Sequence, residues 1–211
     1  MVSIFLQSLL IGYSGAMMPG SLLTYTIDRS IKAGAKSGPL IVIGHSLLEL
    51  VIVVLIFAGA GRVLATDTAQ MIIGFAGGLV LNLMGIGMIR DALLNRLTIN
   101  TESRPEHVKS SMIAAGAIIS AANPYFIFWW AVIGLGLILS AYKAFGIAGV
   151  VIFYLGHTLA DLTWYSFISY LISKTRRFIN LKIYKVVIIA LGLCLCGFGI
   201  SFIAGGFKYL L

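Results

Sequence analysis

Apolar residues occur in six long runs along the chain, and short polar connectors separate these runs. The runs cover about residues 3–27, 38–60, 69–89, 111–140, 145–172 and 183–207. Each run is close to or longer than the ~20 residues that a helix needs to cross the hydrocarbon core of a bilayer. The pattern therefore predicts an all-α integral membrane protein with six transmembrane helices.

The composition agrees with lipid as the main solvent of the chain. Hydrophobic residues make up 60% of the sequence and charged residues only 10%, whereas a soluble domain has roughly 25% charged residues. A soluble fold would expose much of this apolar surface and aggregate. The formal net charge of +8 does not indicate nucleic acid as a partner, because the basic residues lie almost wholly between the apolar runs.

The distribution of basic residues predicts an orientation in the membrane. The first, third and fifth connectors and their edges hold twelve of the 15 lysines and arginines. The other side holds only Arg62, Lys143 and Lys208. Because cytoplasmic loops are enriched in lysine and arginine, we expect these three connectors in the cytoplasm and both termini outside a bacterial inner (plasma) membrane.

The two halves of the sequence resemble each other. Residues 44–50 and 156–162 both read Gly-His-hydroxyl-Leu-x-acid-Leu, 112 residues apart, and the third and sixth runs also align. This indicates a first three-helix repeat at 1–93, a cytoplasmic linker at 94–110 and a second repeat at 111–211. Because three spans are an odd number, the second repeat enters the bilayer from the opposite face, which gives the inverted-topology repeats of many secondary transporters.

The duplicated motif places ionisable residues in the middle of two apolar runs. His45 and Glu49 are four residues apart, as are His157 and Asp161, so each pair shares one helix face. A charge at this depth costs at least ~2.5–3.5 kcal/mol and usually serves function. The repeat predicts that all four meet at the centre, where they could bind a substrate ammonium group, carry a coupling proton, or hold a divalent transition metal. Helix-packing hydrogen bonds are the structural alternative.

Prolines interrupt the first and fourth runs at corresponding positions. Pro19, Gly20 and Ser21 form the first interruption, and Asn123, Pro124 and Tyr125 form the second. Proline removes a backbone donor, so we expect broken helices 1 and 4. The restarting segments would offer unpaired N–H groups to a carboxylate, although a simple kink is also common in membrane helices. Asn82, a polar residue in the third run, is a further candidate contact of this site.

These features resemble the lysine-exporter (LysE/RhtB) family of amino-acid efflux proteins. The resemblance rests on Pro19-Gly20, on Asn123-Pro124, on the size and six-span plan, and on three glycines that lead into the second helix: Gly34, Gly38 and Gly44. It implies export of amino acids or related metabolites, and the wider superfamily includes metal-ion and thiol-disulfide transporters. Ser21 and Tyr125 depart from the family pattern, which often has a proline and a lysine there.

The sequence thus predicts a secondary active exporter of an amino acid or a related small metabolite. The backbone at Pro19-Gly20 and Asn123-Pro124 would hold the carboxylate, and Glu49 and Asp161 would meet the amine. His45 and His157 would tune the acids or carry protons, and Ser21 and Tyr125 are further candidate contacts of the site. The alternative is a divalent metal-ion transporter that uses His45, Glu49, His157 and Asp161. A membrane enzyme is the least favoured class, because no nucleophile or cofactor motif is present. Without an ATP-binding motif, coupling would come from protons or another ion gradient, and the glycine-rich faces are compatible with a homodimer.

Overall fold

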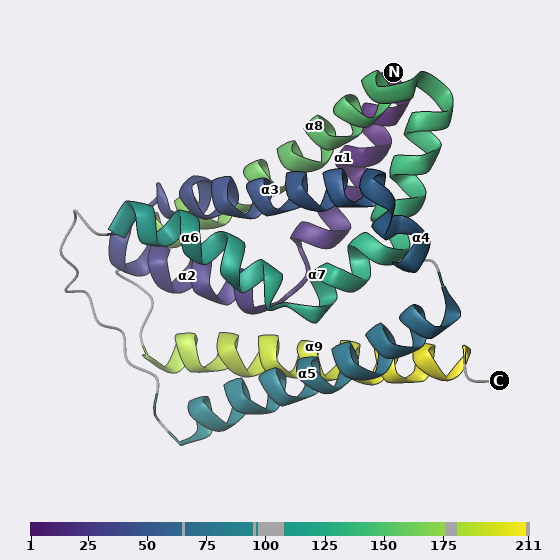
Figure 1. The fold of residues 1–211 in the computed structure, drawn as a ribbon. Helices are drawn as coiled ribbons and strands as arrows, with labels where there is room; N and C mark the ends of the chain where they lie inside the picture. Colours follow the sequence, from purple (N-terminus) through teal and green to yellow (C-terminus); the bar gives the residue numbers. More distant parts are fainter. Residues whose placement is uncertain (65, 95, 97–107, 176–180, 210–211) are drawn as a thin grey trace.

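The computed structural model describes residues 1–64, 66–94, 96, 108–175 and 181–209, and in this part of the chain the regular structure is entirely helical. Figure 1 shows the arrangement of the helices. Most of the predicted linker at 94–110 lies outside the described residues. The elements are α1 (Val2–Ala16), α2 (Ser21–Ala33), α3 (Ser37–Leu55), the π-helical turn η1 (Ile56–Ala60), α4 (Gly61–Leu64), α5 (Asp67–Leu93), α6 (Val108–Ala121), α7 (Pro124–Trp129), the π-helical turn η2 (Trp130–Gly134), α8 (Leu135–Thr175) and α9 (Leu181–Phe207).

Several of these helices are long and apolar enough to cross a membrane. Four continuous stretches qualify in the described part of the chain, and a fifth does if the bent pair α1–α2 counts as one span. The four stretches are Ser37–Gly59, Asp67–Leu93, Pro124–Thr175 and Leu181–Phe207. The protein is therefore a multi-pass, all-helical membrane protein, while the arrangement of six spans in inverted repeats remains a prediction.

The longest stretch is not one straight helix. Phe145 and Gly146 have non-helical backbone angles, and Gly146 has a φ of 60°. Glycine adopts this left-handed conformation without a steric penalty. Figure 1 shows two limbs of α8 that meet in a turn beside the N-terminus. This turn coincides with the boundary that the sequence predicts between the fourth and fifth runs.

The predicted helix breaks are present at both prolines. At the first, α1 ends at Ala16, α2 begins at Ser21, and the two helices form an angle of 78°. At the second, Asn123 has φ −90° and ψ 111°, and Pro124 occupies the first turn of α7. Proline cannot donate a backbone hydrogen bond, and it disfavours the helical conformation of the residue before it. The two breaks follow from this chemistry.

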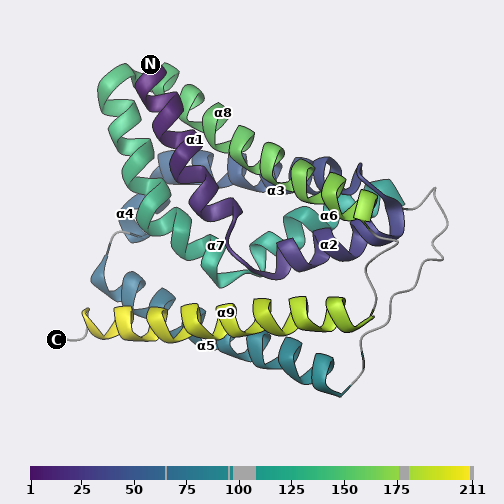
Figure 2. The same ribbon diagram turned by 180° about the vertical axis from the view of Figure 1, so that it is seen from behind.

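Glycines allow the helices to pack closely in pairs. A Cβ atom on Gly78 of α5 would lie 2.6 Å from the carbonyl oxygen of Gly199 of α9, and one on Gly85 would lie 2.5 Å from that of Gly192. Both views show α5 and α9 side by side along one edge of the molecule (Figures 1 and 2). Small residues at such contacts let helix backbones approach in a membrane.

Two further helix pairs also pack closely at glycines. Gly44 of α3 packs against the backbone of α6 at Ile113, and Gly156 of α8 packs against α1 at the carbonyl oxygen of Phe5. Figure 2 shows α1 lying along the second limb of α8. The residues that follow these glycines are His45 and His157, so the two contacts hold both histidines inside the protein.

Candidate functional site

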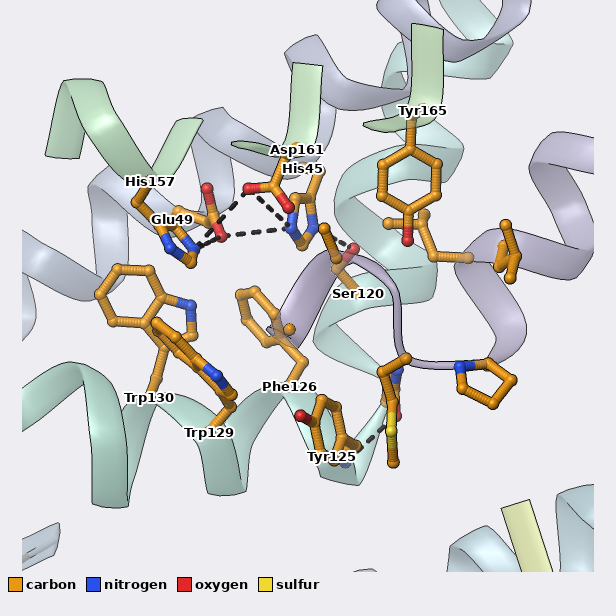
Figure 3. Close-up of a pocket in the computed structure, with 18 of the residues that line it drawn as sticks. His45, Glu49, Ser120, Tyr125, Phe126, Trp129, Trp130, His157, Asp161 and Tyr165 are labelled. Atoms are coloured by element: carbon orange, nitrogen blue, oxygen red, sulfur yellow. Dashed lines mark hydrogen bonds and ion pairs between the residues drawn. The ribbon is translucent and has the colours of Figure 1, made fainter. Parts of the chain in front are cut away.

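The four ionisable residues of the duplicated motif meet in the interior. Nε2 of His157 lies 2.9 Å from Oε1 of Glu49, and Nε2 of His45 lies 3.2 Å from the same oxygen. Oδ2 of Asp161 lies 3.9 Å from Nε2 of His45 and 3.7 Å from that of His157. All four side chains are buried, and Figure 3 shows them facing one another. The structure thus brings together the residues that the repeat predicted to meet.

The cluster has unused capacity to accept hydrogen bonds. Oε2 of Glu49 and Oδ2 of Asp161 are buried and have no hydrogen-bond partner among the described residues. Buried polar atoms are normally satisfied, because an unpaired one costs free energy. These oxygens can therefore receive the donor groups of a cation. Glu49, His45 and Asp161 also each offer a ligand atom within 4.8 Å of the others.

A cavity adjoins the cluster, and aromatic side chains form one of its walls. The cavity is partly open to the outside, and its empty space, which includes the solvent at the opening, is about 570 Å³. His157 stacks on Trp129 with ring centroids 4.6 Å apart. The aromatic lining residues are Tyr125, Phe126, Trp129, Trp130 and Tyr165 (Figure 3). The cavity thus combines carboxylates with an apolar surface.

Both helix breaks line this cavity. Pro19 and Gly20 come from the first break, and Asn123 comes from the second. The breaks lie close together, because a Cβ atom on Gly20 would lie 3.6 Å from Nδ2 of Asn123. Segments about one hundred residues apart in the sequence therefore share one site with the histidine and acid cluster.

The two breaks differ in the backbone groups that they offer. At the start of α2, the N–H of Thr24 donates to the carbonyl of Gly20 at 3.0 Å, which is the first backbone hydrogen bond of this helix. The N–H groups of Ser21, Leu22 and Leu23 have no acceptor in the described part of the chain. These groups and the helix dipole favour an anion.

The second break offers no such groups in its first turn. The side-chain oxygen Oδ1 of Asn123 accepts a hydrogen bond from the N–H of Tyr125 at 3.1 Å. The backbone carbonyl of Asn123 accepts from the N–H groups of Phe126 and Ile127. The expectation of unpaired N–H groups at both breaks is therefore wrong for the second break. Asparagine is a good N-cap, and Pro124 has no N–H to offer.

Three further residues predicted at the site differ in whether they reach the cavity. Tyr125 lines the cavity and stacks on Phe202 of α9 with centroids 5.9 Å apart. Ser21 does not line the cavity, although its buried Oγ has no partner among the described residues. Asn82 lies elsewhere: its Nδ2 donates to the carbonyl of Gly78 at 2.8 Å, and its side chain lies against Gly199. The structure therefore does not bring Asn82 to the site.

One polar contact of the cluster, Ser120, was not predicted from the sequence. Oγ of Ser120 lies 2.6 Å from Nδ1 of His45 and 2.7 Å from the carbonyl oxygen of Gly116. Ser120 is only 1% exposed and lines the cavity. Its position three residues before Asn123, as a polar residue in an apolar run, is the signal that would have identified it.

A polar cavity at two helix breaks in a multi-pass helical membrane protein is a feature of many transporters. The chain belongs to the LysE type translocator family, whose sequence model matches residues 13–206. It is 26% identical over 197 residues to the chemotactic transduction protein ChpE of Pseudomonas aeruginosa, and the aligned region covers 93% of this chain and 96% of ChpE. It is 23% identical over 210 residues to the putative amino acid efflux protein YcgF of Bacillus subtilis, over 100% of both chains. No solved structure gives a significant match.

Proposed function

We propose that this protein is a secondary active exporter of an amino acid or a related small zwitterion across the bacterial inner membrane. Its family consists of translocators, and the name of the full-length relative YcgF refers to amino acid efflux. The observation that carries the proposal is the pairing of two kinds of group around one cavity. Buried carboxylate oxygens of Glu49 and Asp161 have no hydrogen-bond partner among the described residues, and the start of α2, whose first N–H groups have no acceptor there, lines the same cavity.

This pairing matches the two charges of an amino acid. The ammonium group would donate to Glu49 and Asp161, which accept well in a buried setting. The carboxylate would lie at the N-terminus of α2, where N–H groups point outward. No lysine or arginine lines the cavity among the described residues, and the N-terminus of α2 would supply positive potential to the carboxylate.

The packing of the helices supports a mechanism with inverted repeats. Alignment of the third and sixth runs matches Gly78 to Gly192 and Gly85 to Gly199. In the structure Gly78 packs on Gly199, and Gly85 packs on Gly192. Such exchanged contacts are expected of a two-fold axis between α5 and α9. Rocking of the two halves about that axis would expose the cavity to each side in turn, with both termini outside and protons or another ion gradient as the source of energy.

Efflux from proteoliposomes loaded with a mixture of the twenty L-amino acids tests the proposal. Mass spectrometry of the released solutes identifies the substrate, and Zn²⁺ release from metal-loaded vesicles is measured in parallel. We expect amino-acid release that falls at least tenfold in Glu49→Gln and Asp161→Asn. Asp91→Asn is the matched control, because Asp91 is exposed and pairs with Arg96. Wild-type release from both cavity variants, or release of Zn²⁺ alone, would refute the proposal.

A further inference from the structure

The two histidines of the cluster have different surroundings at their second nitrogen. Nδ1 of His45 contacts the hydroxyl of Ser120 on α6. Nδ1 of His157 is buried and has no hydrogen-bond partner among the described residues. It faces Gly12 of α1, where a Cβ atom would lie 3.0 Å from this nitrogen. Nε2 of both histidines therefore faces the acids, whereas Nδ1 has a hydroxyl partner in His45 only.

Helix packing shows that Ser120 and Gly12 occupy corresponding places. Gly44 packs on the carbonyl of Ile113 and the N–H of Ala117, and Gly156 packs on the carbonyl of Phe5 and the N–H of Leu9. Ile113 thus corresponds to Phe5, and Ala117 corresponds to Leu9. Three residues further along each helix stand Ser120 and Gly12. One half has a hydroxyl where the other half has no side chain.

Ser120 also contacts the second helix break. Its carbonyl oxygen accepts from the N–H of Asn123 at 3.0 Å, and Asn123 caps α7 through its side chain. A series of contacts therefore runs from Glu49 to the start of α7: the ion pair of Glu49 with His45, the hydrogen bond of His45 with the Ser120 hydroxyl, and the hydrogen bond of the Ser120 carbonyl with the N–H of Asn123. Among the described residues, His157 has no corresponding contact with the first break.

The hydroxyl of Ser120 can keep its contact with either form of His45. It has one hydrogen and two neighbours, Nδ1 of His45 and the carbonyl of Gly116. If Nδ1 carries a hydrogen, Ser120 accepts it and donates to Gly116; if Nδ1 is bare, Ser120 donates to the ring. The contact between α3 and α6 thus survives a change of tautomer at His45.

We propose that Ser120 is a positioning residue that couples the histidine and acid cluster to the helix break at Asn123–Pro124, through His45 and in one half of the protein only. Binding at Glu49 and Asp161 shifts His45, and Ser120 passes this shift to the start of α7. The inference rests on the proposed function, because it assigns how occupancy of the proposed site reaches a helix break.

The test uses full-length protein in proteoliposomes loaded with the mixture of twenty L-amino acids. Ser120→Ala should lower efflux about tenfold, which lies within the ~5- to 150-fold range of coupling between sites. Fluorescence of Trp129 and Trp130, which line the cavity, should still respond to the same mixture. Ser120→Thr, which keeps the hydroxyl, should restore efflux.

Ser8→Ala is the matched control for lost packing. Ser8 is also 1% exposed and donates to the carbonyl of Phe153 at 2.7 Å, and it contacts none of the four cluster residues. The Ser8→Ala variant should retain efflux, even if its melting temperature falls as far as the melting temperature of the Ser120→Ala variant. A double-mutant cycle with His45→Gln adds a readout that a structural role would not move. If Ser120 acts through His45, the double variant should lose no more efflux than His45→Gln alone.

Three results would overturn the inference: wild-type efflux in Ser120→Ala, independent and multiplying losses in the cycle, or no recovery in a folded Ser120→Thr. If Ser120→Ala does not fold, Ser120→Cys replaces it, and equal efflux from the Cys and Thr variants would overturn the inference. Unchanged efflux in both Glu49→Gln and Asp161→Asn would refute the proposed function itself. Loss in Glu49→Gln without loss in Ser120→Ala would refute only the role of Ser120.

Discussion

Nε2 of His157 lies 2.9 Å from Oε1 of Glu49, and this buried contact joins residues 108 positions apart in the chain. It links α8 to α3 at the wall of the cavity, where Glu49 also meets His45. The cluster therefore exists only when both halves of the chain are packed together. The cluster therefore holds the two halves of the molecule together and is also the proposed binding site.

Removal of one partner from this cluster should destabilise the protein strongly. His157→Ala leaves the Glu49 carboxylate with one close partner, and breaking a buried pair in this way costs ~3–5 kcal/mol. Unfolding in detergent should show this loss. The double variant His157→Ala/Glu49→Gln should recover part of it, because residue 49 is then neutral and leaves no charge without its partner. Equal stability of wild type and His157→Ala would show that the contact contributes nothing to folding.

The N-cap at the second break should matter for transport beyond its effect on stability. Asn123→Ala removes the acceptor for Tyr125 N–H and should cost ~1 kcal/mol of stability. Thr66→Ala is a matched control, because Thr66 caps α5 in the same way at an exposed position. Both variants should lose similar stability in thermal melts, and only Asn123→Ala should lose efflux. Equal efflux from the two would mean that the cap has no part in transport.

The α5–α9 contact should tolerate no side chain at its glycines. Gly78→Ala would place a Cβ atom 2.6 Å from the Gly199 carbonyl oxygen, and such overpacking typically costs ~1–3 kcal/mol. Gly87→Ala on the same helix meets nothing within 4 Å and should be neutral or stabilising by up to ~1 kcal/mol. Melting temperatures of the two variants check this difference. A lower melting temperature for Gly87→Ala than for Gly78→Ala would contradict the packing.

The sequence was most informative where the membrane makes a residue type costly. Two histidine and acid pairs inside apolar runs need partners, and their equal spacing in the two halves predicted that they meet. Proline predicted the breaks because it has no N–H and restricts the residue before it. These inferences depend on residue chemistry and needed no knowledge of helix orientation.

Features that depend on helix orientation could not be read from the sequence. Asn82 lies on an apolar helix whose periodicity indicates no face, and its contacts with Gly78 and Gly199 turn it toward α9. The N–H groups at the second break are paired because the side chain of Asn123 folds back on α7. That conformation is set by tertiary geometry. The pairing of Ser120 with His45 likewise depends on how α6 lies on α3.

The most direct measurement of the central claim is the affinity of the cavity for the exported amino acid. Titration of tryptophan fluorescence gives the Kd of wild type, Glu49→Gln, Asp161→Asn and the control Asp91→Asn. A hydrogen bond to a charged group is worth ~1.5–3 kcal/mol, and 1.4 kcal/mol is tenfold in affinity. Weakening of Kd by at least about tenfold in both cavity variants, with no change in Asp91→Asn, is the predicted result. Wild-type Kd in both cavity variants would contradict the assignment of Glu49 and Asp161 to the substrate site.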